Sequence, residues 1–303
     1  MGHGHWHGTV TAMHRRRLGW VLAITLSVAG VQVVGGALSG SLALLADAAH
    51  MVTDAAGIAA ALAAVWLAGR PATDSRTYGM QRAEILAALV NALLLGGVGL
   101  WVLVSALRRW SDPPEVETGL MLALAVTGAL ANAGCLVLLR EGQSSSLNLR
   151  GAYLEVVGDL LGSLTVVVAG VLIATTGYQR ADVLASLLIG SFILPRAWRL
   201  LRDVADVLLE ATPRGVDLGH VREHIRSVRG VVDVHDLHAW TITSGVPVLS
   251  AHVVVDDDCI ARGQTGAVLD RLGECLSGHF DVSHCTFQVE PVGHQAHEAA
   301  HHA

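Results

Sequence analysis

The sequence contains no lysine, and all 20 of its basic residues are Arg. Charged residues make up only 15% of the 303 residues, whereas soluble domains typically contain about 25%. The four Cys show neither the CxxC spacing of a thiolate zinc site nor the density of a disulfide framework. The formal net charge of −6 gives no electrostatic support for a nucleic-acid partner. These absences argue against a disordered chain, a disulfide-stapled miniprotein and a nucleic-acid-binding protein.

Apolar residues dominate instead, at 52% of the chain with a mean hydropathy of +0.51. A membrane-spanning helix needs roughly 20 mostly apolar residues. Six windows meet this requirement: 18–38, 42–68, 83–107, 118–139, 152–175 and 182–201. The first window is too long for a signal peptide and no small-residue cleavage site follows it. We therefore predict an integral membrane protein with six transmembrane α-helices.

The acidic residues are unevenly distributed along the chain. Residues 1–203 hold 14 Arg and 12 acidic residues, whereas residues 204–303 hold 6 Arg and 14 acidic residues. This shift indicates a membrane part followed by an acidic soluble part. The predicted regions are a His-rich N-terminal tail (1–17), a transmembrane domain (18–203), a soluble domain (204–292) and a His-rich C-terminal tail (293–303). The tails either bind metal or are solvated.

Arginines in the short loops set the orientation of a membrane protein, because cytoplasmic loops carry the excess of positive charge. Eleven of the 14 Arg in the membrane part lie on the side of the N-terminus, and three lie on the opposite side. We therefore expect a multi-pass protein of the cell membrane with both termini in the cytoplasm.

The soluble part shows a different pattern. Amphipathic helices are predicted at 216–228 and 264–280, and β-branched, alternating segments predict strands at 231–242, 248–255 and 282–289. The order is α-β-β-α-β, which favours an α+β domain with its helices on one face of a small sheet.

Two of the apolar windows contain paired ionisable residues. The second holds His50 and Asp54, and the fifth holds Glu155 and Asp159, each pair at i and i+4 and so on one helical face. Ionisable groups at bilayer depth cost roughly 2.5–3.5 kcal/mol each on insertion scales and are functional candidates by default. One imidazole and three carboxylates can form a tetrahedral shell for a divalent cation.

The alternative is that these residues only connect helices by hydrogen bonds. Neither span contains an Arg that could neutralise three carboxylates, and Arg196 lies near the end of its window, within reach of the interface. We therefore expect a bound cation or protons to balance the charge. Asp47 lies on the same face as His50, and two roles stay open for it: orienting His50 or forming an interhelical hydrogen bond.

The soluble part also carries candidate metal ligands. His235 and His252 lie on successive predicted strands, and Glu290 ends the third. They could meet at one edge of the sheet, with His238 as an accessory group, or they could be ordinary surface side chains.

Four segments in this order carry a resemblance to a known family. They are "SLALLADAAHMVTDAAG" (41–57), "RPATDSRTYGMQRAEILAALVNALLL" (70–95), "NLRGAYLEVVGDLLGS" (148–163) and "VVDVHDLHAWTITSG" (231–245). The chain resembles the cation diffusion facilitators, which are proton-coupled exporters of zinc and other divalent cations. The resemblance implies six spans, a homodimer and a cytoplasmic domain of ferredoxin-like shape.

The resemblance also implies roles for particular residues. The family's membrane transport site falls on His50, Asp54, Glu155 and Asp159, and its cytoplasmic metal positions fall on His235, His252 and Glu290. A charge interlock between the third span and the cytoplasmic domain would join Arg82 to Asp206 or Glu210. The zinc branch typically has His where this chain has Glu155, which implies a weaker preference for zinc.

The function expected from these features is export of a divalent cation, with zinc first, in exchange for protons, while the cytoplasmic domain senses metal. The same mechanism could serve cadmium, cobalt, manganese or iron(II). An intramembrane metalloenzyme is the alternative from another class, but the HExxH motif of metalloproteases is absent. A pure metal sensor would not need carboxylates in the bilayer.

Overall fold

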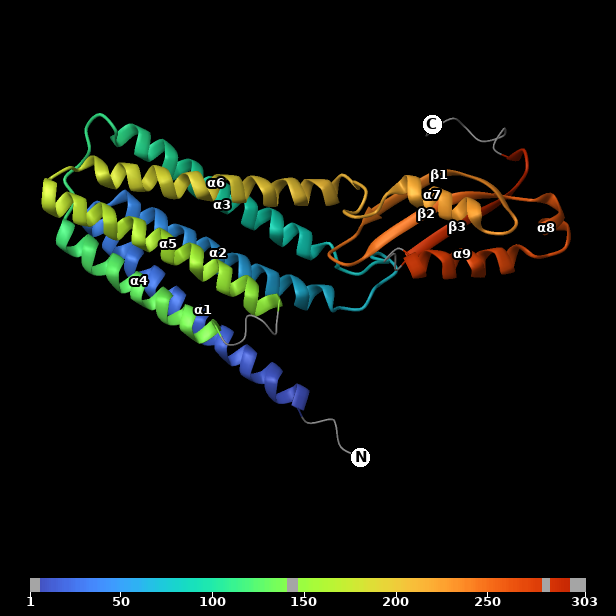
Figure 1. Cartoon of the computed structure of the whole chain (residues 1–303), viewed down its shortest axis with the longest axis horizontal. Helices are drawn as coiled ribbons and strands as arrows, with labels where there is room; N and C mark the ends of the chain where they lie inside the picture. The colour runs from blue at the N-terminus through green and yellow to red at the C-terminus, as the bar shows by residue number, and fades with distance from the viewer. Residues whose placement is uncertain (1–5, 141–146, 280–283, 295–303) are drawn as a thin grey trace. The chain divides into compact units, whose positions relative to one another are not determined.

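The computed structural model describes residues 6–140, 147–279 and 284–294, with side chains placed for residues 19–140, 150–276 and 284–294. The described chain forms two compact units, residues 1–63 with 87–201 and residues 64–86 with 202–303. Six long helices come first (Figure 1): α1 (Trp6–Ser39), α2 (Leu42–Ala68), α3 (Ala83–Arg109), α4 (Thr118–Arg140), α5 (Leu147–Thr176) and α6 (Arg180–Leu208). Each contains a segment long and apolar enough to cross a membrane, which confirms the six predicted spans.

Three helices extend by five residues or more beyond one end of their predicted windows: α1, α5 and α6, which runs to Leu208 where the window ended at 201. Helix α1 begins at Trp6, so residues 6–17 are helical although we expected a tail there. Residues 9–17 contain neither Gly nor Pro, and nothing in them stops the helix. Helix α5 begins at Leu147, which places Glu155 about two turns inside the helix and not near its start. Residues 1–5 and 295–303 of the predicted tails lie outside the described residues.

The six helices carry large apolar side chains on their outer surface. Soluble monomers rarely expose large continuous apolar patches, whereas a membrane protein presents such side chains to lipid. The most exposed examples, each above 60%, include Leu38, Leu62, Trp66, Leu130, Val137, Phe192 and Trp198. The distribution is what a bundle surrounded by hydrocarbon requires.

Small residues let the helices approach closely. A Cβ on Gly128 of α4 would lie 2.3 Å from Nε2 of Gln32 in α1. A Cβ on Gly99 of α3 would lie 2.9 Å from Cδ2 of Leu194 in α6. Helix association in lipid depends on such close packing, because apolar surface gains little by leaving one hydrocarbon environment for another.

The N-terminus of α2 is capped by a carboxylate from another helix. Asp182, in the first turn of α6, is only 2% exposed. Its Oδ1 accepts a hydrogen bond from the Ser41 hydroxyl at 2.6 Å, and its Oδ2 accepts one from the Leu42 backbone N–H at 2.9 Å. The backbone N–H of Ala43 donates to Oδ1 at 3.2 Å. A negative charge at this end also interacts favourably with the helix dipole, so Asp182 ties α2 to α6.

The C-terminal domain contains α7 (Leu218–Ser227), β1 (Val231–Thr241), β2 (Pro247–Val255), α8 (Asp257–Ala261), α9 (Thr265–His279) and β3 (His284–Pro291). The sheet order is β1-β2-β3, with β1 antiparallel and β3 parallel to β2. Helices α7 and α9 bury Val221, Ile225 and Leu272 against the sheet residues Leu249 and Val253. This confirms the predicted α-β-β-α-β order with helices on one face. The sequence pattern missed α8, because one turn of helix is too short to show periodicity.

We expect Asp182→Asn to lower the free energy of unfolding by about 1–3 kcal/mol, because the amide cannot accept from all three donors and leaves buried N–H or O–H groups unpaired. Thermal unfolding of the purified protein in detergent would measure this. Asp112→Asn, an exposed acid between α3 and α4, is the matched control and should leave the midpoint unchanged. Equal midpoints for the two variants would show that the cap contributes nothing.

Candidate metal centres

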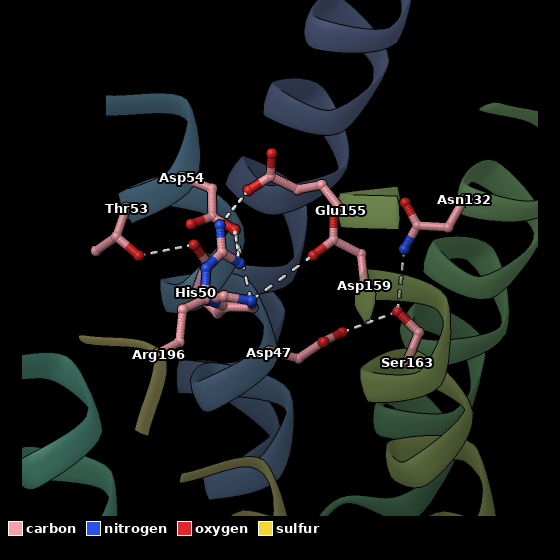
Figure 2. A network of polar contacts seen from close by, with 9 residues as sticks. All are labelled: Asp47, His50, Thr53, Asp54, Asn132, Glu155, Asp159, Ser163 and Arg196. Carbon is pink, nitrogen blue, oxygen red and sulfur yellow. Dashed lines mark hydrogen bonds and ion pairs between the residues drawn. The ribbon is translucent and has the colours of Figure 1, made fainter. Parts of the chain in front are cut away.

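The first candidate centre lies between α2 and α5 (Figure 2). His50 and Asp54 are one turn apart on α2, and Asp159 faces them from α5. His50 Nε2 lies 3.4 Å from Oδ2 of Asp54 and 4.0 Å from Oδ1 of Asp159. One ligand atom from each of the three residues lies within 4.8 Å of the other two. The two helices thus bring together one imidazole and two carboxylates.

This group is buried and incompletely hydrogen-bonded. Asp54 is 8% exposed and Asp159 is 3% exposed. Within the described part of the chain, neither Nδ1 of His50 nor Oδ1 of Asp159 has a hydrogen-bond partner. Buried polar atoms are normally paired, so a buried carboxylate oxygen without a hydrogen bond, next to an imidazole and a second carboxylate, indicates a site for a ligand. Imidazole nitrogen and carboxylate oxygen are donors that divalent cations of the zinc type accept.

Glu155, the expected fourth ligand, has a different partner. Nη2 of Arg196, from α6, donates to Oε1 of Glu155 at 2.5 Å, and Nη1 of the same guanidinium donates to Oδ2 of Asp54 at 3.3 Å. Arg196 is therefore a partner that the sequence did not indicate, and it balances the charge of one of the three carboxylates. Ile189 and Ile193 precede Arg196 at helical spacing on the buried face of α6, and this face turns Arg196 toward α2 and α5.

Asp47 lies one turn below His50 in a separate polar layer. It is 1% exposed, and its Oδ2 accepts a hydrogen bond from the Ser163 hydroxyl of α5 at 2.9 Å. Nδ2 of Asn132, from α4, reaches the same Ser163 oxygen at 3.4 Å. Of the two roles left open for Asp47, the structure shows the interhelical hydrogen bond.

The second candidate centre lies on the sheet of the C-terminal domain, on the face away from α7 and α9. His235 and His252 are directly paired across β1 and β2. The register slips by one residue between His235 and His238, and Asp236 in the gap has a φ of 47°. Both Val234 and Leu237 therefore point into the core although they are three residues apart, and His235 points outward beside His252.

Glu290 of β3 completes this group. Its side chain is buried, with Oε2 at 3.1 Å from Nε2 of His235 and Oε1 at 2.8 Å from Nδ1 of His252. Burial opposes ionisation of Glu290, but hydrogen bonds from Gln288 and His235 outweigh it and hold its pKa below the usual range. One ligand atom from each member of the trio lies within 4.8 Å of the other two. Two imidazoles and one ionised carboxylate form a donor set that fits zinc with an open fourth position.

The accessory candidate His238 lies beside this trio. Its Nε2 is 2.8 Å from Oδ1 of Asp236, whose Oδ2 is 3.6 Å from Nε2 of His252. The sequence did not predict that Asp236 approaches both histidines, because this approach depends on the bulge.

The residues of the predicted charge interlock take part in ion pairs. Nη2 of Arg82 lies 3.0 Å from Oε1 of Glu210, whereas Asp206 lies 3.8 Å from Nη2 of Arg214. Nearby, the Thr243 hydroxyl donates to Oε2 of Glu84 at 2.6 Å, a contact that no sequence signal indicated. Exposed ion pairs such as Arg82–Glu210 each contribute only about 0–1 kcal/mol.

Six apolar helices around a buried group of nitrogen and oxygen donors, followed by an α+β domain with a second donor group, define a membrane transporter of metal cations. Comparisons with known proteins assign the family. The family model described as the cation efflux transmembrane domain matches residues 20–209. The model described as the cytoplasmic domain of cation efflux proteins matches residues 213–292. The chain therefore belongs to the cation efflux family, the cation diffusion facilitators.

Individual relatives cover nearly the same span. The chain is 44% identical over 302 residues to the metal cation efflux system protein CzcD of Cupriavidus metallidurans, covering 100% of this chain and 94% of the relative. It is 40% identical to the zinc transporter ZitB of Escherichia coli, covering 96% and 93%. It is 36% identical to the cadmium, cobalt and zinc/H(+)-K(+) antiporter of Bacillus subtilis, covering 87% and 85%.

Family membership settles several points left by the sequence. The protein is a multi-pass membrane transporter of metal cations and not an enzyme. The C-terminal match is to the family's dimerising domain, so the protein is a homodimer. The resemblance read from the four sequence segments is confirmed.

We expect Gly162→Ala to destabilise the contact between α2 and α5. The new Cβ would lie 2.4 Å from Oδ1 of Asp47, whose carboxylate is held by Ser163 and cannot move away freely. Overpacking of this kind typically costs about 1–3 kcal/mol. Thermal unfolding in detergent would measure the loss.

Gly158, one turn earlier on α5, provides the matched control. A Cβ there meets nothing within 4 Å, so Gly158→Ala should be neutral or slightly stabilising. If both variants unfold at the wild-type temperature, the α2–α5 contact at Asp47 is looser than the structure shows.

Proposed function

We propose that the protein exports a divalent metal cation, with zinc as its main substrate, from the cytoplasm in exchange for protons. The observation that carries this proposal is the convergence of His50, Asp54 and Asp159 inside a bundle of six apolar helices. These three residues would hold the cation during its passage. Alternating exposure of the group to the two sides of the membrane, as in transporters generally, would move it across.

The direction of transport rests on the orientation of the chain. Eleven of the 14 Arg in the membrane part lie on the side of the N-terminus, which supports a cytoplasmic location for both termini. We propose the inner or plasma membrane of the cell as the location, with the C-terminal domain in the cytoplasm. Metal sensed by that domain would then be the metal to be removed.

The donor atoms support zinc as the substrate, and they also suit other divalent cations. One imidazole and two carboxylates suit a borderline cation such as zinc, and carboxylates also accept cobalt, cadmium, manganese or iron(II). The names of the relatives point the same way, because one is a zinc transporter and another is named for cadmium, cobalt and zinc.

Proton coupling follows from the chemistry of the ligands. Carboxylates and imidazole bind a metal only when deprotonated, so protons and metal compete for the same atoms. A site that releases its metal on one side of the membrane and takes up protons there has its negative charge balanced when it becomes exposed to the other side again. The antiporter from Bacillus subtilis is named for proton exchange, which supports the same coupling here.

We propose that the C-terminal trio binds metal as a regulator. His235, His252 and Glu290 come from three different strands. A metal bound by all three would hold these strands together on the face of the sheet away from α7 and α9. Metal binding would favour one arrangement of the homodimer over another through its higher affinity for that arrangement.

Asp159→Asn should abolish zinc uptake into proteoliposomes that carry an outward proton gradient, because an amide removes one of the two anionic ligands. Asp54→Asn should do the same. The control variant Glu115→Gln changes an exposed acid between α3 and α4 and should transport at the wild-type rate. Transport by Asp159→Asn at the wild-type rate would show that the cation crosses elsewhere, and insensitivity of the wild type to a protonophore would exclude proton coupling.

His252→Ala should weaken zinc binding to the C-terminal fragment 204–303 by at least about tenfold, since even outer-shell partners of a metal ligand are typically worth 10–100-fold. The core of this fragment is formed by residues within 216–289, so the variant can be studied alone by calorimetry. His220→Ala, on the exposed side of α7, is the control and should bind like wild type. Identical binding isotherms for the two variants would contradict the trio as a site.

A further inference from the structure

The connection between α2 and α3 is attached to one end of the sheet. Residues 64–86 belong to the same compact unit as the C-terminal domain. The Thr243 hydroxyl, just after β1, donates to Oε2 of Glu84 in the first turn of α3 at 2.6 Å. At the same end of the sheet, where β3 begins, the ring centroids of Tyr78 and His284 are 6.3 Å apart. The first turn of α3 therefore follows the position of this end of the sheet.

Thr243 lies at the tip of the hairpin formed by β1 and β2. The Val246 N–H donates to the Thr243 carbonyl at 3.0 Å, and the Ile242 N–H donates to the Val246 carbonyl at 3.1 Å. Gly245 has a φ of 73°, a left-handed conformation that glycine adopts without strain and that closes the turn. The turn joins the two strands that carry the candidate imidazole ligands, so Thr243 is held by both of them.

A β-bulge in β1 lies between the metal trio and this tip. Beyond the bulge, residues 238–241 pair regularly with residues 247–250 of β2. A bulge bends its strand and increases the local twist, so the backbone at Asp236 sets the direction of the segment that follows. Metal bound by all three members of the trio would fix the strands next to Asp236. It would thereby restrict the bulge, and through the bulge the position of Thr243.

The Thr243–Glu84 hydrogen bond is better protected from water than the neighbouring ion pair. Thr243 is only 7% exposed, whereas the side chains of Arg82 and Glu210 are 44% and 59% exposed. Water screens an exposed ion pair, which leaves it weak and tolerant of changes in geometry. A hydrogen bond to a carboxylate is stronger than one between neutral groups and requires the donor to point at the acceptor. A movement of the hairpin tip is therefore felt first at Glu84.

We propose that the hydrogen bond between Thr243 and Glu84 transmits the metal occupancy of the C-terminal trio to the first turn of α3, so that metal on the trio changes the transport rate through this contact. Thr243 and Glu84 are positioning residues, because neither contacts the transported cation. This inference rests on the regulatory role proposed for the trio and adds the contact through which that role is exerted.

A double-mutant cycle on the full-length protein tests this coupling by Zn²⁺ uptake into proteoliposomes. His252→Ala removes one ligand of the trio and should lower the uptake rate by at least about fivefold, the lower end of typical allosteric coupling. In Thr243→Val, which keeps the size of the side chain but cannot donate, the same change should lower the rate by less than about twofold. Thr243→Ser keeps the hydroxyl and should keep the fivefold effect.

Ser244→Ala is the matched control, because Ser244 lies in the same turn with an exposed side chain. His252→Ala should retain its fivefold effect in this background, and loss of the effect would overturn the proposal. Glu84→Ala removes the same hydrogen bond from the side of α3 and covers the case in which Thr243→Val does not fold. In that background, too, His252→Ala should change the rate by less than about twofold.

A purely structural role for the hydrogen bond gives a different result. Thr243→Val then transports more slowly, but His252→Ala still lowers its rate fivefold, and this outcome overturns the proposal. Loss of the fivefold effect in Thr243→Ser overturns it as well, since the hydroxyl is still present. If His252→Ala has no effect in the otherwise unchanged protein, the regulatory role proposed for the trio is wrong and this inference is wrong with it. Failure of the wild type to take up Zn²⁺ would instead contradict the proposed transport function.

Discussion

A carboxylate among apolar helices must have a partner, because an isolated charge in a low-dielectric interior is too unfavourable to persist. This constraint orders the membrane part. Asp182 accepts hydrogen bonds at the N-terminus of α2, and Asp47 accepts one from Ser163 of α5. Asp54 forms ion pairs with His50 and Arg196. In each case the partner belongs to another helix, or the group links two helices. Asp159 faces His50 at 4.0 Å, and its Oδ1 accepts no hydrogen bond within the described residues.

Local periodicity is the reason the sequence predicted so much of the site. His50 and Asp54 share a face because they are four residues apart on a helix, and the same spacing joins Glu155 and Asp159. Long apolar windows likewise identify spans, and β-branched alternation identifies the strands. These features depend on neighbours in the chain, so they can be read without knowing how the helices meet.

Contacts between distant segments could not be read in the same way. Arg196 was expected at the membrane interface, because its position near the end of a window says nothing about which helix faces it. Its place after Ile189 and Ile193 on the buried face of α6 is the signal that was available. The bulge at Asp236 left no such signal, since it depends on the register between β1 and β2 and on a left-handed backbone conformation that few non-glycine residues adopt.

The capping of α2 by Asp182 limits how the bundle can change shape. Three donors at the start of α2 converge on one side chain of α6, and separating them would bury unpaired groups on both helices. This junction therefore behaves as a pivot, at which the two helices can change their mutual angle but cannot slide along each other. An axial shift of α2 would carry α6 with it. The movements left to α2 are tilts about Ser41, and these displace the middle of the helix, where Asp54 lies, more than its first turn.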